Sequence, residues 1–230
     1  MVKENVSRIR QRILEICPKI NQDPGKITVI AVSKGRTTQQ IREAIEAGIT
    51  DIGENRVQEA IIKYNEVSAT RYPLSAIKWH MVGHLQTNKV KEAVKIFDLI
   101  QSVDSVRLAE EINKQAEKIN KIQDILIEVK TSPEEAKFGL KADEAIEVMK
   151  DIAKLKNINI KGLMTVAPIV DDHQETSLYF RMLRELRDKI NELRITGYAL
   201  EVLSMGMTDD FQIAIEEGAN MVRLGRAIFD

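Results

Sequence analysis

The sequence has almost no cysteine. Cys17 is the only one among 230 residues, so an intramolecular disulfide and a thiolate metal cluster are both excluded. Stability must come from an apolar core instead, and hydrophobic residues make up 43% of the chain, within the range of globular proteins. A chain of this length has ample residues for such a core.

Long apolar runs and an excess of one charge are also missing. No stretch approaches the roughly 20 apolar residues of a membrane span, and the N-terminal MVKENVSRIRQRILEI lacks the apolar core of a signal peptide. The 34 basic and 35 acidic residues give a net charge of −1, which provides no electrostatic basis for binding nucleic acid or a membrane. We therefore expect a soluble cytoplasmic protein with neither kind of partner.

No linker rich in proline, glycine or serine divides the chain, and its apolar periodicity predicts alternating helices and strands. Strands are predicted at 27–32, 49–52, 77–82, 98–103, 125–129, 160–166, 200–203 and 220–224. Helices are predicted at about 3–16, 38–47, from 57, 86–96, 105–120, from 132, 141–155, 174–193 and around 211–215. The helix from 57 is expected to bury one face, formed by Val57, Ala60, Ile61 and Tyr64.

Eight strands that alternate with helices are what a (β/α)₈ TIM barrel requires, and about 250 residues is its usual length. We therefore predict an α/β fold in which residues 1–230 form a single barrel domain with an extra N-terminal helix. The alternative is an open doubly wound sheet, which more often has five or six strands.

A lysine stands at the end of the first predicted strand. Residues 27–32 are almost continuously apolar, which is typical of a strand buried on both faces of a parallel sheet. Lys34 follows, and Thr37 with Gln40 fits a capping box that opens the next helix. Lys34 is thus expected at the carboxyl end of a strand, where parallel α/β folds place their chemistry. On position alone, a lysine that merely extends into solvent is the alternative.

A closed barrel would bring further polar residues and glycines to the same rim as Lys34. They follow the second, third, seventh and eighth strands: Asn55, His80, Ser204, Gly206, Arg223, Gly225 and Arg226. The loops after the last two strands are the usual phosphate site of this fold, because glycine lets a phosphate approach backbone N–H groups. An amine facing a phosphate site suggests a phosphorylated aldehyde as ligand, bound as a Schiff base.

Seven segments resemble the pyridoxal 5′-phosphate homeostasis protein family, which shares its barrel with the N-terminal domain of alanine racemase. They are AVSKG (31–35), DIGENRVQE (51–59), WHMVGHLQTNK (79–89), KFGL (137–140), GLMTVAP (162–168), LSMGMTDDFQIAIEEG (203–218) and MVRLGRAIF (221–229). Together they extend over essentially the whole chain. The resemblance implies that pyridoxal 5′-phosphate (PLP) is the cofactor and that Lys34 forms the internal aldimine with it.

The resemblance also implies roles for the other rim residues. Ser204 and the backbone at Gly225 and Arg226 would hold the phosphate, Arg223 would face the pyridine nitrogen, and Asn55 would lie beside the cofactor. The expected cofactor site is completed by His80 and Gly206.

Three positions depart from the commonest pattern of the family. Arg226 stands where a small hydroxylic residue is frequent, so a contact with the phosphate there becomes a backbone or guanidinium one. Thr208 replaces a frequent serine, and the chain ends at Asp230 without the usual glycine. None of these changes removes a chemical role.

Two functions share such a site: a PLP-binding protein without significant turnover, and a fold-type III racemase or decarboxylase. In alanine racemase a tyrosine from an extra β-domain of the partner subunit supplies a second acid/base, whereas this chain ends with its eighth barrel unit. Its own tyrosines fall in predicted helices or linkers, at Tyr64, Tyr72, Tyr179 and Tyr198. An arginine at the ring nitrogen also weakens the cofactor as an electron sink. We therefore expect a monomeric PLP homeostasis protein, not an enzyme, that can release PLP to apo-enzymes.

Two further alternatives fit less well. A barrel enzyme for a phosphorylated sugar, with Lys34 as an aldolase-type lysine, would leave the family resemblance unexplained. His80 and His84 are four residues apart, but they straddle a strand end and Gly83 and need not face the same way. We therefore expect no metal site.

Overall fold

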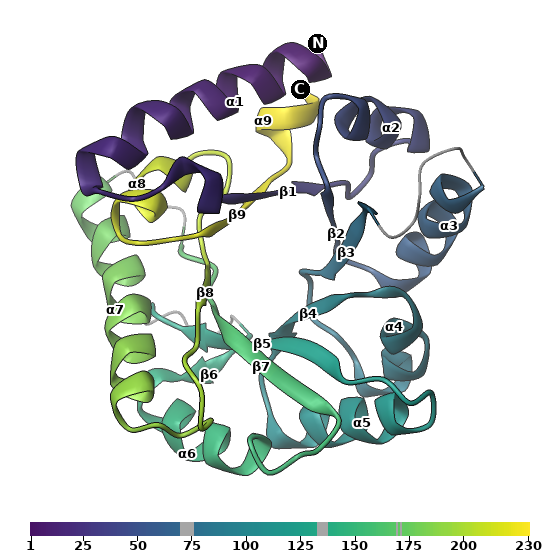
Figure 1. The fold of residues 1–230 in the computed structure, drawn as a ribbon, viewed down its shortest axis with the longest axis vertical. Coiled ribbons are helices and arrows are strands. Elements are labelled where there is room, and N and C mark those ends of the chain that lie inside the picture. The colour runs from purple at the N-terminus through teal and green to yellow at the C-terminus, as the bar shows by residue number, and fades with distance from the viewer. Residues whose placement is uncertain (70–75, 133–137, 169, 171) are drawn as a thin grey trace.

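The structure is a computed structural model that describes residues 1–69, 76–132, 138–168, 170 and 172–230. Eight parallel strands form a closed barrel (Figure 1). They are β1 (Thr28–Val32), β2 (Asp51–Glu54), β3 (Lys78–Met81), β4 (Leu99–Val103), β5 (Gln123–Lys130), β7 (Ile158–Met164), β8 (Val202–Ser204) and β9 (Met221–Leu224). The ring is complete because β1 pairs with both β2 and β9, and β4 pairs with β5. The predicted (β/α)₈ barrel is confirmed.

Helices surround the barrel on its outside (Figure 1). They are α1 (Val2–Ile16), α2 (Thr38–Glu46), α3 (Val57–Ser68), α4 (Val90–Ile96), α5 (Val106–Glu117), α6 (Ala142–Ile152), α7 (His173–Glu192), α8 (Phe211–Glu216) and α9 (Arg226–Phe229), with short 3-10 helices η1 (Cys17–Ile20), η2 (Pro24–Lys26) and η4 (Thr87–Lys89). The predicted capping box of Thr37 and Gln40 is present at the start of α2. The Thr37 hydroxyl accepts from the Gln40 N–H, and the Gln40 side-chain oxygen accepts from the Thr37 N–H. Helix α2 therefore begins directly after the turn that carries Lys34.

The extra N-terminal helix α1 covers the outside of the barrel beside α2, α8 and α9. Its buried stripe recurs at helical spacing and includes Val6, Ile9 and Ile13. The Asn5 side chain donates a buried hydrogen bond of 3.0 Å to the carbonyl of Ile228. The first and last helices of the chain are thereby joined, close to the end of β9.

The main differences from the predicted elements lie between β5 and α6. Leu140–Lys141 forms a two-residue strand, β6, which pairs with the end of β5 and is too short to be predicted from alternation. Helix α6 ends at Ile152, where residues up to 155 were predicted to be helical. Of the predicted helix start at 132–135, residues 133–135 lie outside the described residues.

The barrel interior is partly apolar and partly polar. Five side chains from five strands form an apolar cluster of their own: Ile30, Leu99, Leu126, Met164 and Met221. Four other inward residues are polar and at most 5% exposed: His80, Gln101, Ser204 and Arg223. Buried polar groups need hydrogen-bond partners, and these four find them in one another, as described below.

Candidate functional site

A cavity of about 840 Å³ opens at the carboxyl ends of the barrel strands. This is the face at which TIM barrels place their active sites. Five of the residues expected from the sequence line this cavity: Lys34, Asn55, Arg223, Gly225 and Arg226. Residues of the loops after β7 and β8 and of α7 complete its walls.

Lys34 is presented by a tight turn between β1 and α2. The Arg36 N–H donates to the carbonyl of Ser33 at 2.9 Å, and Gly35 has φ +68°. A positive φ in this position of a turn favours glycine, which lacks a Cβ. The Lys34 side chain is exposed toward the cavity, and none of the hydrogen bonds or ion pairs among the described residues engages its amine. Lys34 therefore offers an amine that can react with a ligand.

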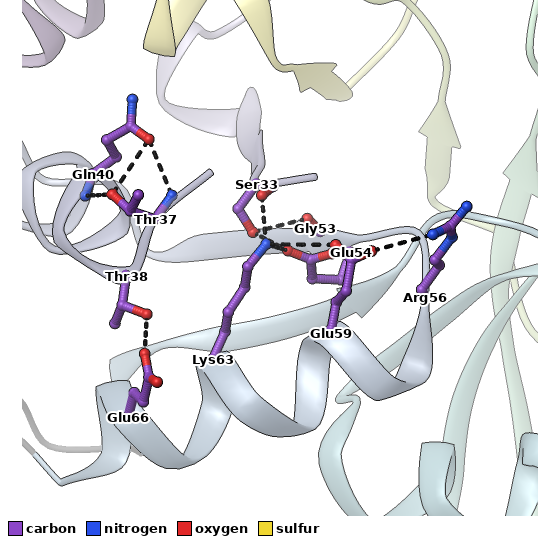
Figure 2. A network of polar contacts seen from close by, with 10 residues as sticks. All are labelled: Ser33, Thr37, Thr38, Gln40, Gly53, Glu54, Arg56, Glu59, Lys63 and Glu66. Carbon is purple, nitrogen blue, oxygen red and sulfur yellow. Dashed lines mark hydrogen bonds and ion pairs between the residues drawn. The ribbon is translucent and has the colours of Figure 1, made fainter. Parts of the chain in front are cut away.

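A buried ion pair holds the backbone immediately before Lys34 (Figure 2). Lys63 Nζ, from α3, donates to Glu54 Oε1 at 2.5 Å and to the carbonyl of Ser33 at 2.6 Å. The Ser33 hydroxyl donates to the same Glu54 oxygen at 2.6 Å, and the Ser33 N–H donates to the carbonyl of Gly53 at 2.9 Å. Ser33 is therefore fixed to β2 and α3 by both its backbone and its side chain, which orients the turn that carries Lys34.

Arg223 reaches the cavity from β9 with its guanidinium largely buried. Nη1 donates to the carbonyl and the hydroxyl of Ser204, each at 2.8 Å, and Nη2 donates to the carbonyl of Thr165 at 2.7 Å. Burial lowers the pKa of Arg223 to about 10, with the carboxylates of Glu128 and Asp210 opposing the shift. The guanidinium therefore remains a fixed cation at neutral pH.

A chain of hydrogen bonds continues from Arg223 through the barrel interior. The Ser204 hydroxyl donates to Gln101 Oε1 at 2.6 Å, and Gln101 Nε2 lies 3.1 Å from His80 Nδ1. Because the Gln101 amide nitrogen can only donate, His80 Nδ1 accepts and its Nε2–H donates to Asp51 Oδ1 at 2.8 Å. Arg223, Ser204, Gln101 and His80 therefore each donate to the next residue in the chain, which ends at Asp51.

Burial alone would raise the pKa of Asp51, but hydrogen bonds from His80 and Thr50 lower it overall. The chain therefore joins an anion at the amino ends of the strands to the Arg223 cation at their carboxyl ends. His80 and Ser204 are parts of this connection and are not among the residues that line the cavity.

The loop after β8 brings backbone and hydroxyl groups to the opposite wall. Gly206 has φ +93°, and a Cβ there would lie 2.6 Å from the Cβ of Ala214, so only glycine lets this loop pack on α8. Met207 and Thr208 then line the cavity beside Gly225. The Thr208 hydroxyl accepts from the Ala227 N–H at 3.2 Å, which joins the loop after β8 to the start of α9.

Residues 3–230 match the family model described as alanine racemase, N-terminal domain. A curated relative, the pyridoxal phosphate homeostasis protein of Aquifex aeolicus, is 40% identical over 226 residues, which cover 98% of this chain and 96% of the relative. The protein of that name in Escherichia coli is 32% identical over 232 residues, which cover 99% and 95%. This chain belongs to the pyridoxal phosphate homeostasis protein family.

Solved structures agree with this membership. PipY of Synechococcus elongatus, which has been solved with and without PLP, has a TM-score of 0.88 and 33% identity to this family member, and each chain is covered completely. Alanine racemase of Clostridium difficile has a TM-score of 0.73 at 15% identity, with 95% of this chain and 58% of the racemase covered. The racemase therefore shares the fold with this chain.

Arg36 and Thr208 also line this cavity, although neither was among the site residues expected from the sequence of this family member. Arg36 lines it and forms a 2.6 Å ion pair with Asp230, and Arg226 pairs with Asp209. With Lys34 and Arg223, four cationic side chains face two carboxylates, those of Asp209 and Asp210, in the lining. The excess of positive charge suits an anion. In the sequence, the signal for Arg36 was its place two residues after Lys34, and the signal for Thr208 was a hydroxyl beside a glycine loop.

Tyrosines are missing from the lining of the cavity as far as the structure describes the chain. Tyr64, Tyr179 and Tyr198 lie outside it, and Tyr72 is outside the described residues. The Tyr198 hydroxyl instead accepts from the N–H of Ile160 at 3.0 Å. Across the described residues, no helix is long and apolar enough to cross a membrane.

Proposed function

We propose that this protein binds pyridoxal 5′-phosphate in the cavity at the strand ends, holds it covalently at Lys34, and releases it to apo-enzymes without significant turnover. The observation that carries the proposal is that the unpaired Lys34 amine and the Arg223 guanidinium line one cavity together with the start of α9. The PLP-bound structure of PipY and the names of the curated relatives support it.

The residues of the cavity fit the chemistry of this cofactor. When bound, PLP supplies an aldehyde that reacts reversibly with an amine, and Lys34 offers one. A phosphate dianion requires hydrogen-bond donors and positive charge, which the Thr208 hydroxyl, the backbone at Gly225 and the surplus of cationic side chains provide. Asn55 and Arg223 would then contact the pyridine ring, with Arg223 at the ring nitrogen.

In this proposal, the other expected residues support the site without contacting the cofactor through their side chains. Ser204 and His80 hold Arg223 in place through the interior hydrogen bonds, and Gly206 allows the loop that carries Thr208 to pack on α8. The Arg226 guanidinium is paired with Asp209, so Arg226 serves the phosphate through its backbone.

The absence of turnover follows from the charge of Arg223. A cation fixed by three hydrogen bonds at the ring nitrogen disfavours protonation of that nitrogen, and without it the ring withdraws electrons weakly. The proposal includes one domain over residues 1–230, because the strands from β1 to β9 close a single barrel, and it treats the protein as a monomer.

Covalent attachment at Lys34 gives the direct test. The protein incubated with PLP is expected to be yellow, and borohydride reduction followed by peptide mapping should place the cofactor on Lys34. Lys34→Ala should remove the colour and the adduct, while Lys89→Ala, at the lysine in η4, should keep both. An adduct at Lys89 instead, or none after addition of PLP, would contradict the proposal.

A further inference from the structure

A smaller pocket of about 260 Å³ adjoins the cofactor cavity. The two share Val82 and Val166 in their linings. One wall is formed by the rings of His84 and Phe138, which are stacked with centroids 3.8 Å apart and planes 13° from parallel. The pocket is large enough for a small organic ion of a few heavy atoms.

A buried carboxylate from β5 enters this pocket. Glu128 is 7% exposed and lines the pocket, and its Oε2 atom is buried with no hydrogen-bond partner among the residues that the structure describes. Buried carboxylate oxygens are normally satisfied by a donor, because leaving one bare costs free energy. Glu128 Oε2 therefore marks a position where a donor from outside the chain would be stabilised.

The charges around Glu128 define what kind of donor fits. Burial, and then the nearby Asp104 carboxylate, raise the pKa of Glu128 to about 7, against the opposing effect of Arg223 and of Lys130, which also lines the pocket. Asp104 is itself 3.4 Å from His84 Nδ1. A cation that entered the pocket would favour the ionised form of Glu128 and offset its repulsion from Asp104.

A primary ammonium ion matches this environment better than a metal ion does. Among the described residues, no group of three or more histidine, cysteine, aspartate or glutamate side chains is placed to hold a metal. An ammonium ion needs only a few acceptors for its three N–H donors, and an alkyl substituent can pack on apolar walls such as Val82 and Phe138.

We propose that this side pocket, beside the cofactor cavity, binds small primary ammonium compounds, with Glu128 Oε2 accepting a hydrogen bond from the ammonium group. An amine held there would lie beside the cavity in which the proposed function places the cofactor, since the two share Val82 and Val166; that consequence rests on the proposed function, whereas the binding itself does not.

Calorimetric titration of the cofactor-free protein with ethylammonium chloride tests the site, with sodium chloride as the ionic-strength control. Glu128→Gln is expected to weaken binding at least tenfold, whereas Glu201→Gln, at an exposed carboxylate, leaves the affinity unchanged. Equal affinities of the wild-type protein and Glu128→Gln would overturn the proposal, as would the lack of any binding.

The pH dependence is a second readout that needs no variant. Ionised Glu128 attracts an ammonium group far more strongly than protonated Glu128 does, so the affinity of the wild-type protein should rise about tenfold between pH 6 and pH 8. Binding near pH 7 should also release protons, seen as a heat that varies with the ionisation enthalpy of the buffer. A flat pH profile would overturn the proposal even if Glu128→Gln failed to fold. Cofactor binding without ammonium binding would leave the proposed function standing.

Discussion

Ser204 lies at the centre of the polar interior of the barrel. Its hydroxyl accepts from Arg223 at 2.8 Å and donates to Gln101 at 2.6 Å, so both of its main hydrogen-bonding directions are used within the chain. A serine at a phosphate loop and a serine that orients an arginine look alike in sequence. They differ in which property of the protein changes when the hydroxyl is removed.

We predict that Ser204→Ala destabilises the cofactor-free protein. The substitution leaves Gln101 Oε1 without its donor and removes one acceptor from a buried guanidinium, which costs about 1.5–3 kcal/mol for a hydrogen bond to a charged group. Urea unfolding of the cofactor-free protein measures this change. Ser7→Ala, at an exposed serine of α1, should stay within about 0.5 kcal/mol of the wild type.

The opposite outcome would place Ser204 at the phosphate. In that case the unfolding free energy would hardly change, and the variant would lose its preference for PLP over pyridoxal, which lacks the phosphate. Measuring the affinities of Ser204→Ala and Ser7→Ala for PLP and for pyridoxal therefore distinguishes a serine that orients Arg223 from one that contacts the phosphate.

At the scale of elements, α3 stabilises the turn between β1 and α2 through Lys63. This lysine is 8% exposed and is bonded to Glu54 and to the carbonyl of Ser33. The buried ion pair thus connects β2, α3 and the residue before Lys34 (Figure 2). The loss of stability should be largest when only one of the two charges is removed, because the other charge is then buried without compensation.

We predict that Lys63→Met lowers the free energy of unfolding by about 3–5 kcal/mol, the range for breaking a buried pair from one side. Adding Glu54→Leu should recover part of that loss, since replacing both charges by apolar groups is often close to neutral. Urea unfolding of the single and double variants measures the coupling. Lys3→Met, at an exposed lysine of α1, serves as the matched control.

Adduct formation at Lys34 provides the functional readout for the same variants. If the ion pair orients the turn, the double variant should react with PLP more slowly than the wild type even where its stability is restored. An unchanged rate in the double variant would show that Ser33 is held well enough by the remaining hydrogen bonds.

These contacts also show what the sequence could predict and what it could not. Every barrel strand and the start of α2 were predictable, because apolar runs, glycines and the capping box of Thr37 act within a few residues. The buried face of α3 was predicted only in part. Val57 and Ala60 are buried as expected, but Lys63 is buried as well, because its partner Glu54 is nine residues away on β2. Periodicity of apolar residues does not reveal a lysine that is buried with a counter-ion.

The candidate site shows the same limit across longer distances. Strand ends in the sequence correctly pointed to Lys34, Asn55 and Arg223 as neighbours of one cavity. The partner of Ser204, however, is Gln101, 103 positions away on a strand that is not its neighbour in the sheet. Only closure of the barrel brings these two side chains together, so the sequence could place Ser204 at a strand end but could not give the direction of its hydroxyl.

The barrel separates two kinds of polar environment. A chain of hydrogen bonds that starts at the Arg223 guanidinium and ends at Asp51 crosses its interior. The Lys34 amine, by contrast, is exposed at the carboxyl rim on a turn. A ligand attached to Lys34 would therefore be bound at an accessible position, and Arg223, which the proposed function places at its ring nitrogen, is held by three hydrogen bonds.

This arrangement predicts transfer of the cofactor without catalysis. A bond between an aldehyde and an amine can be hydrolysed, so the protein loaded with PLP should pass it to an apo pyridoxal enzyme and restore that enzyme's activity. Incubation with D- and L-amino acids should give neither racemisation nor decarboxylation above the level of free PLP, because Arg223 at the ring nitrogen, as the proposed function has it, would keep the ring a weak electron acceptor. Lys34→Ala, mixed with the same amount of PLP, should restore the apo-enzyme no better than free PLP does. Sustained turnover of an amino acid that disappears in Lys34→Ala would instead assign the protein to the enzymes of this fold.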